Sequence, residues 1–502
     1  MNPDANVTPE EIKHPLGLKY LFLTEAMERF SYYGMRAILV LYLTKQLEFP
    51  REQALSVYAV YTSLVYLTPL LGGFLADKYL GSRKAIFIGG FVMMLGEFSL
   101  MFSGMSHSPF LLNLGLGLLI IGNGFFKPNI STIVGSLYED GDPRRDSAFT
   151  IFYMGINVGA FFSPLVCGTL GEGIGFEYGF AAAAVGMLIG VVIFMLGQKS
   201  FGTAGFPPSR KNLDSDSKLL PIDWVHISGA SIGLVALVLG VVFFLDPIMS
   251  AWSAIHPTVK LVLGIALLLA ASGSLFGIAA KGGGAADVKS VAAILILSIF
   301  VVFFWVGFEQ AGGTMTLFAE AETDRYINLG FWSGEIPASY FQSVNPIFIV
   351  TLAPIFSMLW FKVDSSKYKI SVAIKMAIGL LLLGAGFVLL FAGRGQVDLE
   401  AGIKASPFFL VGVYFLHTTG ELCLSPIGLS LVTKLSPPRM VSLMMGIWFL
   451  SSAAANFFAG KLEAYLKDYD IDLYFFLLCT SFGAGVTLLL ISPLLKRWMK
   501  GN

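Results

Sequence analysis

Long apolar stretches alternate with short polar connectors along the whole of this chain. Each stretch has about 20 residues or more, the length that an α-helix needs to cross a hydrocarbon core of roughly 30 Å. The pattern predicts fourteen membrane-spanning helices, in the approximate ranges 17–44, 54–78, 83–105, 109–137, 146–171, 178–198, 223–246, 256–280, 288–318, 337–361, 370–392, 405–434, 439–462 and 471–498. The predicted fold class is therefore an all-α polytopic membrane protein.

Two polar connectors divide these helices into groups of six, two and six. Residues 199–220 contain glycine, two prolines and charges of both signs, and 281–287 reads KGGGAAD; both compositions are typical of solvated connectors. We predict a six-helix bundle over 1–198, a connector with two additional transmembrane helices over 199–287, and a second six-helix bundle over 288–502. The GxxxG spacing of Gly229 and Gly233 in the inserted pair predicts close helix packing there.

Basic residues are distributed unevenly between alternate connectors. With the N-terminus inside, the predicted cytoplasmic connectors hold most of the Lys and Arg, whereas the outer ones are poorer in them and carry acids such as Glu320 and Glu335. This asymmetry favours an even number of spans with both termini cytoplasmic. The first 20 residues lack the basic start, apolar middle and cleavage site of a secretory signal.

Composition agrees with a membrane protein and excludes several partners. The chain has 502 residues, of which 55% are hydrophobic and only 13% charged, outside the balance of soluble globular proteins. Its 33 basic and 33 acidic residues cancel, so no net field favours nucleic acid. The three cysteines lie in apolar runs without metal-binding spacing, and we expect free thiols, no metal and no cofactor.

The interior of the first apolar stretch contains four charged residues, Glu25, Glu28, Arg29 and Arg36. Four charges facing lipid would cost on the order of 10 kcal/mol, at roughly 2.5–3.5 kcal/mol each. Glu25 and Glu28 are spaced i,i+3, and Glu25 and Arg29 are spaced i,i+4, so much of this charge shares one helical face. Such a face is expected to line a polar pathway through the protein.

Charges also occur at equivalent positions of the two six-helix halves. Lys127 lies deep in the fourth span of the first half and Glu421 deep in the fourth span of the second, while Arg36 and Glu309 lie in the two first spans. Transporters with repeated halves place equivalent helices around a central site. We therefore predict salt bridges Lys127–Glu421 and Arg36–Glu309 across a central cavity, with static pairs that only hold the fold as the alternative.

The backbone around Lys127 and Glu421 contains helix-weakening residues. Pro128 follows the lysine, and Gly420 and Pro426 flank the glutamate; these predict bending, although ordinary packing also accommodates prolines in membrane helices. A carboxylate whose cationic partner leaves in a low-dielectric site takes up a proton, which makes Glu421 and the Glu25/Glu28 pair candidate proton switches. For His417, one turn before Glu421, a structural role is favoured over proton sharing.

Five stretches together resemble one known family. Residues 25–33 are similar to the ExxERFxYY signature of the proton-dependent oligopeptide transporters, a branch of the major facilitator superfamily. GGFLADKYLGSRK at 72–84, FYMGINVGA at 152–160, FWVGFEQ at 304–310 and GELCLSPIGLSLVTKLSPPRM at 420–440 resemble further motifs of that family. The resemblance implies a bacterial member that carries di- and tripeptides with protons across the cytoplasmic inner membrane by alternating access.

The resemblance also implies roles for particular residues. Proton coupling would fall to Glu25, Glu28, Arg29 and Glu421, because the second span has no histidine to share it. The gate pairs would be Arg36–Glu309 and Lys127–Glu421. The substrate-binding residues would be Arg29, Tyr33, Arg36, Tyr66, Lys127, Asn157, Trp305, Gln310, Asn345, Glu421 and Trp448.

Three other functions are alternatives to peptide symport. A relative that takes up nitrate or another small anion with protons would keep the cationic site. A membrane-embedded enzyme is not favoured, since no HExxH motif or credible nucleophile arrangement occurs, and the connectors are short for a peptide sensor with a signalling domain. The expected partners are small peptides, protons as coupling ion and membrane lipid, with the monomer as functional unit.

Overall fold

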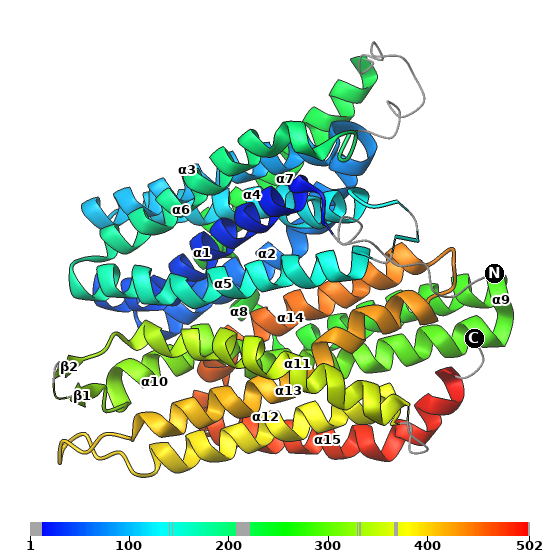
Figure 1. Ribbon diagram of the computed structural model, residues 1–502. Coiled ribbons are helices and arrows are strands. Elements are labelled where there is room, and N and C mark those ends of the chain that lie inside the picture. The colour runs from blue at the N-terminus through cyan, green and yellow to red at the C-terminus, as the bar shows by residue number, and fades with distance from the viewer. Residues whose placement is uncertain are drawn as a thin grey trace. The chain divides into compact units, whose positions relative to one another are not determined.

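The computed structural model describes residues 13–139, 141–142, 144–206, 221–328, 330, 333–365 and 370–499, and most of them are helical (Figure 1). The all-α prediction is confirmed. In the first part of the chain the helices are α1 (Leu16–Lys45), α2 (Arg51–Leu75), η1 (Ala76–Leu80), α3 (Ser82–Ser106), α4 (Pro109–Ser136), α5 (Arg144–Gly173), α6 (Phe176–Gly197), η2 (Gln198–Phe201), α7 (Pro221–Phe243) and α8 (Leu245–Ala254).

The remaining elements include one small sheet. They are α9 (Pro257–Phe308), η4 (Glu309–Gly312), α10 (Thr314–Glu322), β1 (Tyr326–Asn328), β2 (Ser333–Glu335), η5 (Ala338–Ser343), α11 (Val344–Asp364), α12 (Val372–Arg394), α13 (Pro407–Leu435), α14 (Val441–Lys467) and α15 (Leu473–Trp498). The two strands pair antiparallel, with Tyr326 opposite Glu335.

Eleven helical stretches among the described residues are long and apolar enough to cross a membrane, against the fourteen predicted. The difference has three sources. The helix α1 is long enough but carries too many charges, the fully described part of α7 covers only Ile227–Phe243, and two predicted spans form one continuous helical stretch in α9. The backbone of α9 breaks at Gly284, whose φ of 65° is non-helical, inside the connector predicted at 281–287. The connector at 199–220 is described only as far as residue 206, where it forms η2 and a turn; the rest lies outside the described residues.

The chain forms two compact units. The first contains Met1–Ile38 and Leu67–Leu239, and the second contains Leu39–Tyr66 and Gly240–Asn502. The C-terminal end of α1 and the N-terminal end of α2 lie in the second unit, where they form ion pairs. Arg51 Nε lies 2.8 Å from Glu463 Oε1, Lys467 Nζ lies 2.6 Å from Glu52 Oε1, and Lys45 pairs with Glu320. The three-part division predicted from the sequence stays a prediction.

Backbone contacts at glycine hold the helices of each unit together. In the first unit, α3 packs on α4 so closely that a Cβ on Gly96 would lie 2.9 Å from the Gly115 carbonyl oxygen. By contrast, the predicted close packing at Gly229 and Gly233 is wrong for the described residues, because no atom lies within 4 Å of a Cβ at either position.

In the second unit, α12 and α13 lie side by side (Figure 1). Glycines at 379, 386 and 393 form a stripe on α12, here called the glycine stripe, which faces α13. A Cβ on Gly379 would lie 2.8 Å from the Gly420 carbonyl oxygen, one on Gly386 would collide with the His417 ring, and one on Gly393 would lie 2.9 Å from Phe409. The backbone next to Glu421 is therefore fixed by direct contact with α12.

Candidate functional site

Three of the charged residues in α1 form one buried cluster in the first unit. Arg29 Nε lies 2.9 Å from Glu25 Oε1 and 2.5 Å from Glu28 Oε2. The exposed fractions are 3% for Glu25, 0% for Glu28 and 3% for Arg29. The helical spacing that suggested a shared face therefore does bring these side chains together, and the guanidinium supplies the countercharge that burial of carboxylates requires.

Neighbouring helices fix and extend this cluster. On α5, a Cβ at Gly159 would lie 2.9 Å from the Arg29 Cβ, so α1 and α5 are in backbone contact at the arginine. The guanidinium also lies over the Tyr32 ring, 5.5 Å from its centroid, and Tyr32 packs edge-on against Tyr33. On α4, Lys127 interacts electrostatically with Glu28.

The proline next to Lys127 does not end its helix. The helix α4 runs without interruption through Pro128, and Lys127 itself is half-buried. The Thr68 hydroxyl on α2 donates to the Ile120 carbonyl at 2.9 Å, so α2 is held against α4 along this stretch. Asn157 on α5 is 4% exposed and its amide donates to the Tyr153 carbonyl at 3.0 Å.

A second acidic centre lies on α13 in the second unit. Asn345 Nδ2 on α11 donates to Glu421 Oε2 at 3.1 Å and to Thr418 Oγ1 at 2.9 Å. Thr418 in turn donates to the Tyr414 carbonyl at 2.6 Å. The structure thus brings together Glu421 and Asn345, both of which the family resemblance had named as substrate-binding residues. Thr418 was missed by the sequence analysis, although its position one turn before Glu421 marks the same face.

A tryptophan on α11 supports the α13 backbone beside this centre. Trp360 Nε1 donates to the Leu422 carbonyl at 3.4 Å. That carbonyl loses its usual helical donor because the residue four positions on is Pro426, which has no backbone N–H. The Trp360 ring lies beneath the ammonium group of Lys375, 4.7 Å from its centroid, and Lys375 pairs with Asp364 at 2.8 Å.

The other residues assigned by resemblance lie in varied surroundings. The Gln310 amide donates to the Val306 and Ala459 carbonyls and accepts from Thr314, so it links η4 to α14. Trp305 packs edge-on against Phe304 and Phe308. Within their own units, Arg36, Glu309 and Trp448 are buried, and Tyr33 and Tyr66 are half-buried.

His417 lies in an apolar setting on α13. It is 2% exposed, its ring centroid is 4.9 Å from that of Phe387 and 6.4 Å from that of Phe308, and Gly386 of the glycine stripe faces it. Its ring also forms a hydrogen bond with the Leu383 backbone. These contacts suit the structural role that the sequence analysis favoured.

The predicted cross-cavity pairs join residues of different units. Arg36 and Lys127 belong to the first unit, and Glu309 and Glu421 belong to the second. The pairings Arg36–Glu309 and Lys127–Glu421 therefore stay predictions, as do the individual substrate-binding and proton-coupling roles.

Cysteine and metal chemistry add little to these clusters. The three cysteines are free, with Cys167 and Cys423 buried and Cys479 exposed. Across the described ranges, no group of three or more His, Cys, Asp or Glu side chains is arranged to hold a metal ion.

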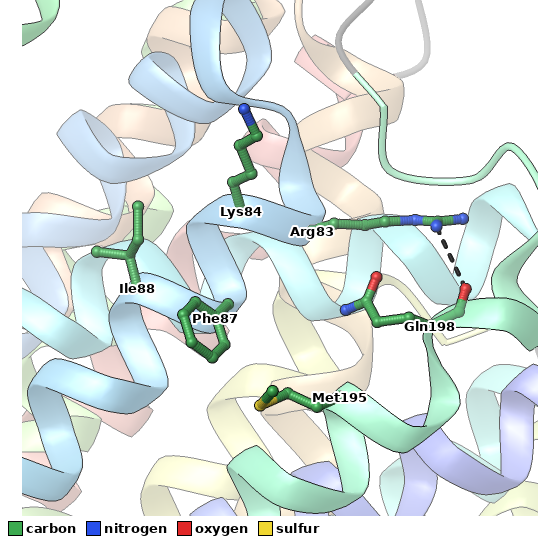
Figure 2. A pocket seen from close by; sticks show the side chains of 6 residues that line it. All are labelled: Arg83, Lys84, Phe87, Ile88, Met195 and Gln198. Carbon is green, nitrogen blue, oxygen red and sulfur yellow. Dashed lines mark hydrogen bonds between the residues drawn. The ribbon is translucent and has the colours of Figure 1, made fainter.

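A separate pocket lies at one end of α3 and α6 in the first unit (Figure 2). Its volume is about 520 Å³, and it is lined by Arg83, Lys84, Phe87, Ile88, Met195 and Gln198. The Arg83 guanidinium is engaged in structure: it donates to the carbonyls of Gln198, Gly202 and Ala204 at 3.2, 2.6 and 2.6 Å. Arg83 therefore anchors the segment after α6, and the pocket contains none of the predicted site residues.

Comparison with known proteins places the chain in a family. Residues 83–475 match the POT family. The chain is 36% identical over 499 residues to the peptide transporter YePEPT of Yersinia enterocolitica subsp. palearctica, covering 96% of this chain and 94% of the relative. It is 33% identical over 496 residues to the di-/tripeptide transporter of Lactococcus lactis subsp. cremoris, covering 96% of each.

A solved structure supports the same assignment. The crystal structure of peptide transporter POT in complex with sulfate superposes with a TM-score of 0.81, at 35% identity, over 97% of this chain and 96% of that one. The fold is therefore the major facilitator fold of that family, as the motifs implied. Given these matches over nearly its whole length, the protein is a multi-pass membrane transporter that belongs to the POT family.

Proposed function

We propose that this protein is a proton-coupled symporter of di- and tripeptides, working by alternating access in the bacterial cytoplasmic membrane with both termini in the cytoplasm. The observation that carries the proposal is the pair of acidic centres: in one, Arg29 pairs with Glu25 and Glu28, and in the other, Glu421 accepts from the neutral amide of Asn345. The names of the relatives, a peptide transporter and a di-/tripeptide transporter, support the substrate class.

The chemistry of a short peptide fits charges of both signs. A zwitterionic peptide loses much hydration on entering a membrane protein, so its termini need charged partners. Lys127, Arg29 and Arg36 would attract the carboxylate, and Glu421 with Asn345 would bind the amino group. Contacts to the termini and the amide leave the side chains unrestrained, which permits many peptide sequences.

Protons would supply the driving force and no other cofactor is needed. A proton that crosses 100 mV contributes about 2.3 kcal/mol, enough for roughly fiftyfold accumulation at 1.4 kcal/mol per decade. Protonation of Glu28 would loosen its pairing with Arg29, while Glu25 keeps the guanidinium compensated. We propose the monomer, surrounded by lipid, as the functional unit.

Uptake into liposomes tests the proposal. Glu28→Gln should abolish dialanine accumulation driven by an imposed proton gradient while sparing dialanine exchange without a gradient. Glu400→Gln, on an exposed residue, is the matched control and should behave like wild type. Unchanged driven accumulation in Glu28→Gln removes Glu28 from the mechanism.

Competition distinguishes the substrate classes. If the cationic site serves nitrate or another small anion instead, labelled dialanine will neither accumulate nor compete with anion uptake. Accumulation of dialanine that unlabelled di- and tripeptides suppress supports peptide symport.

A further inference from the structure

A fourth buried carboxyl group of the first unit lies outside the motif of α1. Glu97 is in the middle of α3 and is 0% exposed. It is the single charged residue between Lys84 and His107 in the sequence. The cost of placing a charge in an apolar span applies here as it does to α1, but α3 has no arginine beside the carboxyl group.

The contacts of Glu97 lead to the α1 cluster. The Ser31 hydroxyl on α1 donates to Glu97 Oε1 at 3.2 Å, and Ser31 follows Glu28 by three residues, on the same helical face. Glu97 Oε2 is buried without a hydrogen-bond partner in the described part of the chain. Glu97 and Glu28 also interact electrostatically. Two helices thus bring two fully buried carboxyl groups into one environment.

The charged and titratable groups around Glu97 do not neutralise it. Glu28 faces it from α1 and Cys167 interacts with it from α5. On α4, Lys127 acts on Glu28, and on α6, Glu177 lies against Gly104 at the far end of α3. Among the described residues no basic side chain is an ion-pair partner of Glu97, and a charged carboxylate buried without such a partner is costly.

We propose that Glu97 is a proton-storing residue that exchanges its proton with Glu28 during transport, an inference that rests on the proposed proton symport. Two nearby buried carboxylates do not both ionise readily, and one proton is shared between them. In the exchange, the O–H bond of the Glu97 carboxyl group breaks and one forms on Glu28. The negative charge moves to Glu97, where the Ser31 hydroxyl bond stabilises it, and Arg29 remains paired with Glu25.

A proton-storing role and a packing role of Glu97 predict different effects of a neutral isostere at this position. Glutamine keeps the shape and the neutral charge of the resting carboxyl group, so a purely structural Glu97 tolerates Glu97→Gln. A proton-storing Glu97 does not, because the amide cannot release and regain a proton. Glu97→Asp keeps the titratable group and should restore part of the function.

The experiment compares Glu97→Gln, Glu97→Asp and Ser31→Ala in liposomes, with Ser99→Ala, another buried serine of α3, as the matched control. We expect Glu97→Gln to lower gradient-driven dialanine accumulation at least about tenfold and to alter its pH profile, while dialanine exchange without a gradient stays close to wild type. Glu97→Asp should recover part of the driven accumulation, and Ser31→Ala should shift the pH profile.

Infrared spectroscopy provides a readout that does not depend on transport. The carbonyl band of a protonated carboxylic acid should be present in the wild type and weaker in Glu97→Gln. A wild-type pH profile and wild-type driven accumulation in Glu97→Gln overturn the inference; if that variant does not fold, unchanged profiles in both Glu97→Asp and Ser31→Ala overturn it. Absence of driven dialanine uptake in the wild type would instead overturn the proposed function.

Discussion

The two acidic centres of this protein are built in opposite ways. In the first unit, Glu25 and Glu28 share Arg29 from the same helix, so the cluster carries its own countercharge. In the second unit, the hydrogen bond to Glu421 comes from the neutral amide of Asn345 on another helix. One centre has a cation within its unit, and this single guanidinium balances one of the two carboxylates. In the other, the carboxylate accepts from a neutral amide of its own unit.

Removal of the arginine should have the largest effect. Arg29→Ala removes the ion-pair partner of the buried Glu25 and Glu28 and is expected to destabilise the protein by roughly 3–5 kcal/mol, measured by thermal unfolding in detergent. The triple variant Glu25→Gln, Glu28→Gln, Arg29→Met, which has no charge to compensate, should recover much of that stability. Equal melting temperatures for Arg29→Ala and wild type would contradict the view that this centre is internally compensated.

Removal of the cation predicted to reach the second centre should affect transport more than folding. Lys127→Ala is expected to lower gradient-driven dialanine uptake at least about tenfold, which corresponds to roughly 1.4 kcal/mol. Charge reversal with Lys127→Glu and Glu421→Lys together should restore part of it. If Lys127→Ala and Glu421→Gln both transport like wild type, the pairing of these residues has no role in function.

Loss of the neutral donor should have a smaller effect on the second centre. Asn345→Ala removes the hydrogen bond to Glu421 Oε2 and is expected to cost about 1–3 kcal/mol, measured as a loss of dialanine affinity by calorimetry. Thr418→Val, which keeps the shape of the side chain but not the hydroxyl group, should cost less than Asn345→Ala. The reverse order would mean that the hydroxyl group, and not the amide, positions the carboxylate.

A surface ion pair outside both acidic centres should have the smallest effect on stability. Hydrogen bonds from the Arg144 side chain hold the pKa of the Asp142 carboxyl group below its usual value of 3.8. Because the folded-state pKa is lower than the unfolded one, the pair stabilises the fold above about pH 4 and loses this effect as the pH falls through the folded value. Asp142→Asn should therefore lower the melting temperature slightly at pH 7 and by less at pH 3. An equal shift at both pH values would contradict this origin.

The sequence predicted the helices well because the membrane imposes a length and an apolar composition that can be read directly. The ranges 109–137 and 370–392, for example, correspond to α4 and α12 within two residues at each end. The short helix α8 was not predicted, because ten residues in a connector carry no spanning signal. Helical spacing was also sufficient to bring Glu25, Glu28 and Arg29 together on α1.

The parts of the site that depend on contacts between helices were harder to predict. Asn345 on α11 donates to both Glu421 and Thr418 on α13, and of the two partners of Glu421's hydrogen-bond network the family resemblance had named only Asn345 as a site residue. The free-energy cost of placing a charge in an apolar span, which drew attention to the charges of α1, applies equally to Glu97. A lone glutamate without a nearby arginine, however, has no helical spacing that indicates a charge cluster. The support of Leu422 by Trp360 needs a tertiary contact that no local rule indicates.

The glycine stripe has a practical consequence for following the transport cycle. Because α12 and α13 touch backbone to backbone at Gly379 and Gly420, the two helices should shift as one rigid body. A spectroscopic label on the outer surface of α12, at the 43% exposed Val388, would then report displacement of the Glu421 carboxylate without touching it. The label would be attached through Val388→Cys. Replacement of the exposed Cys479 by serine would then leave position 388 as the one exposed thiol among the described residues.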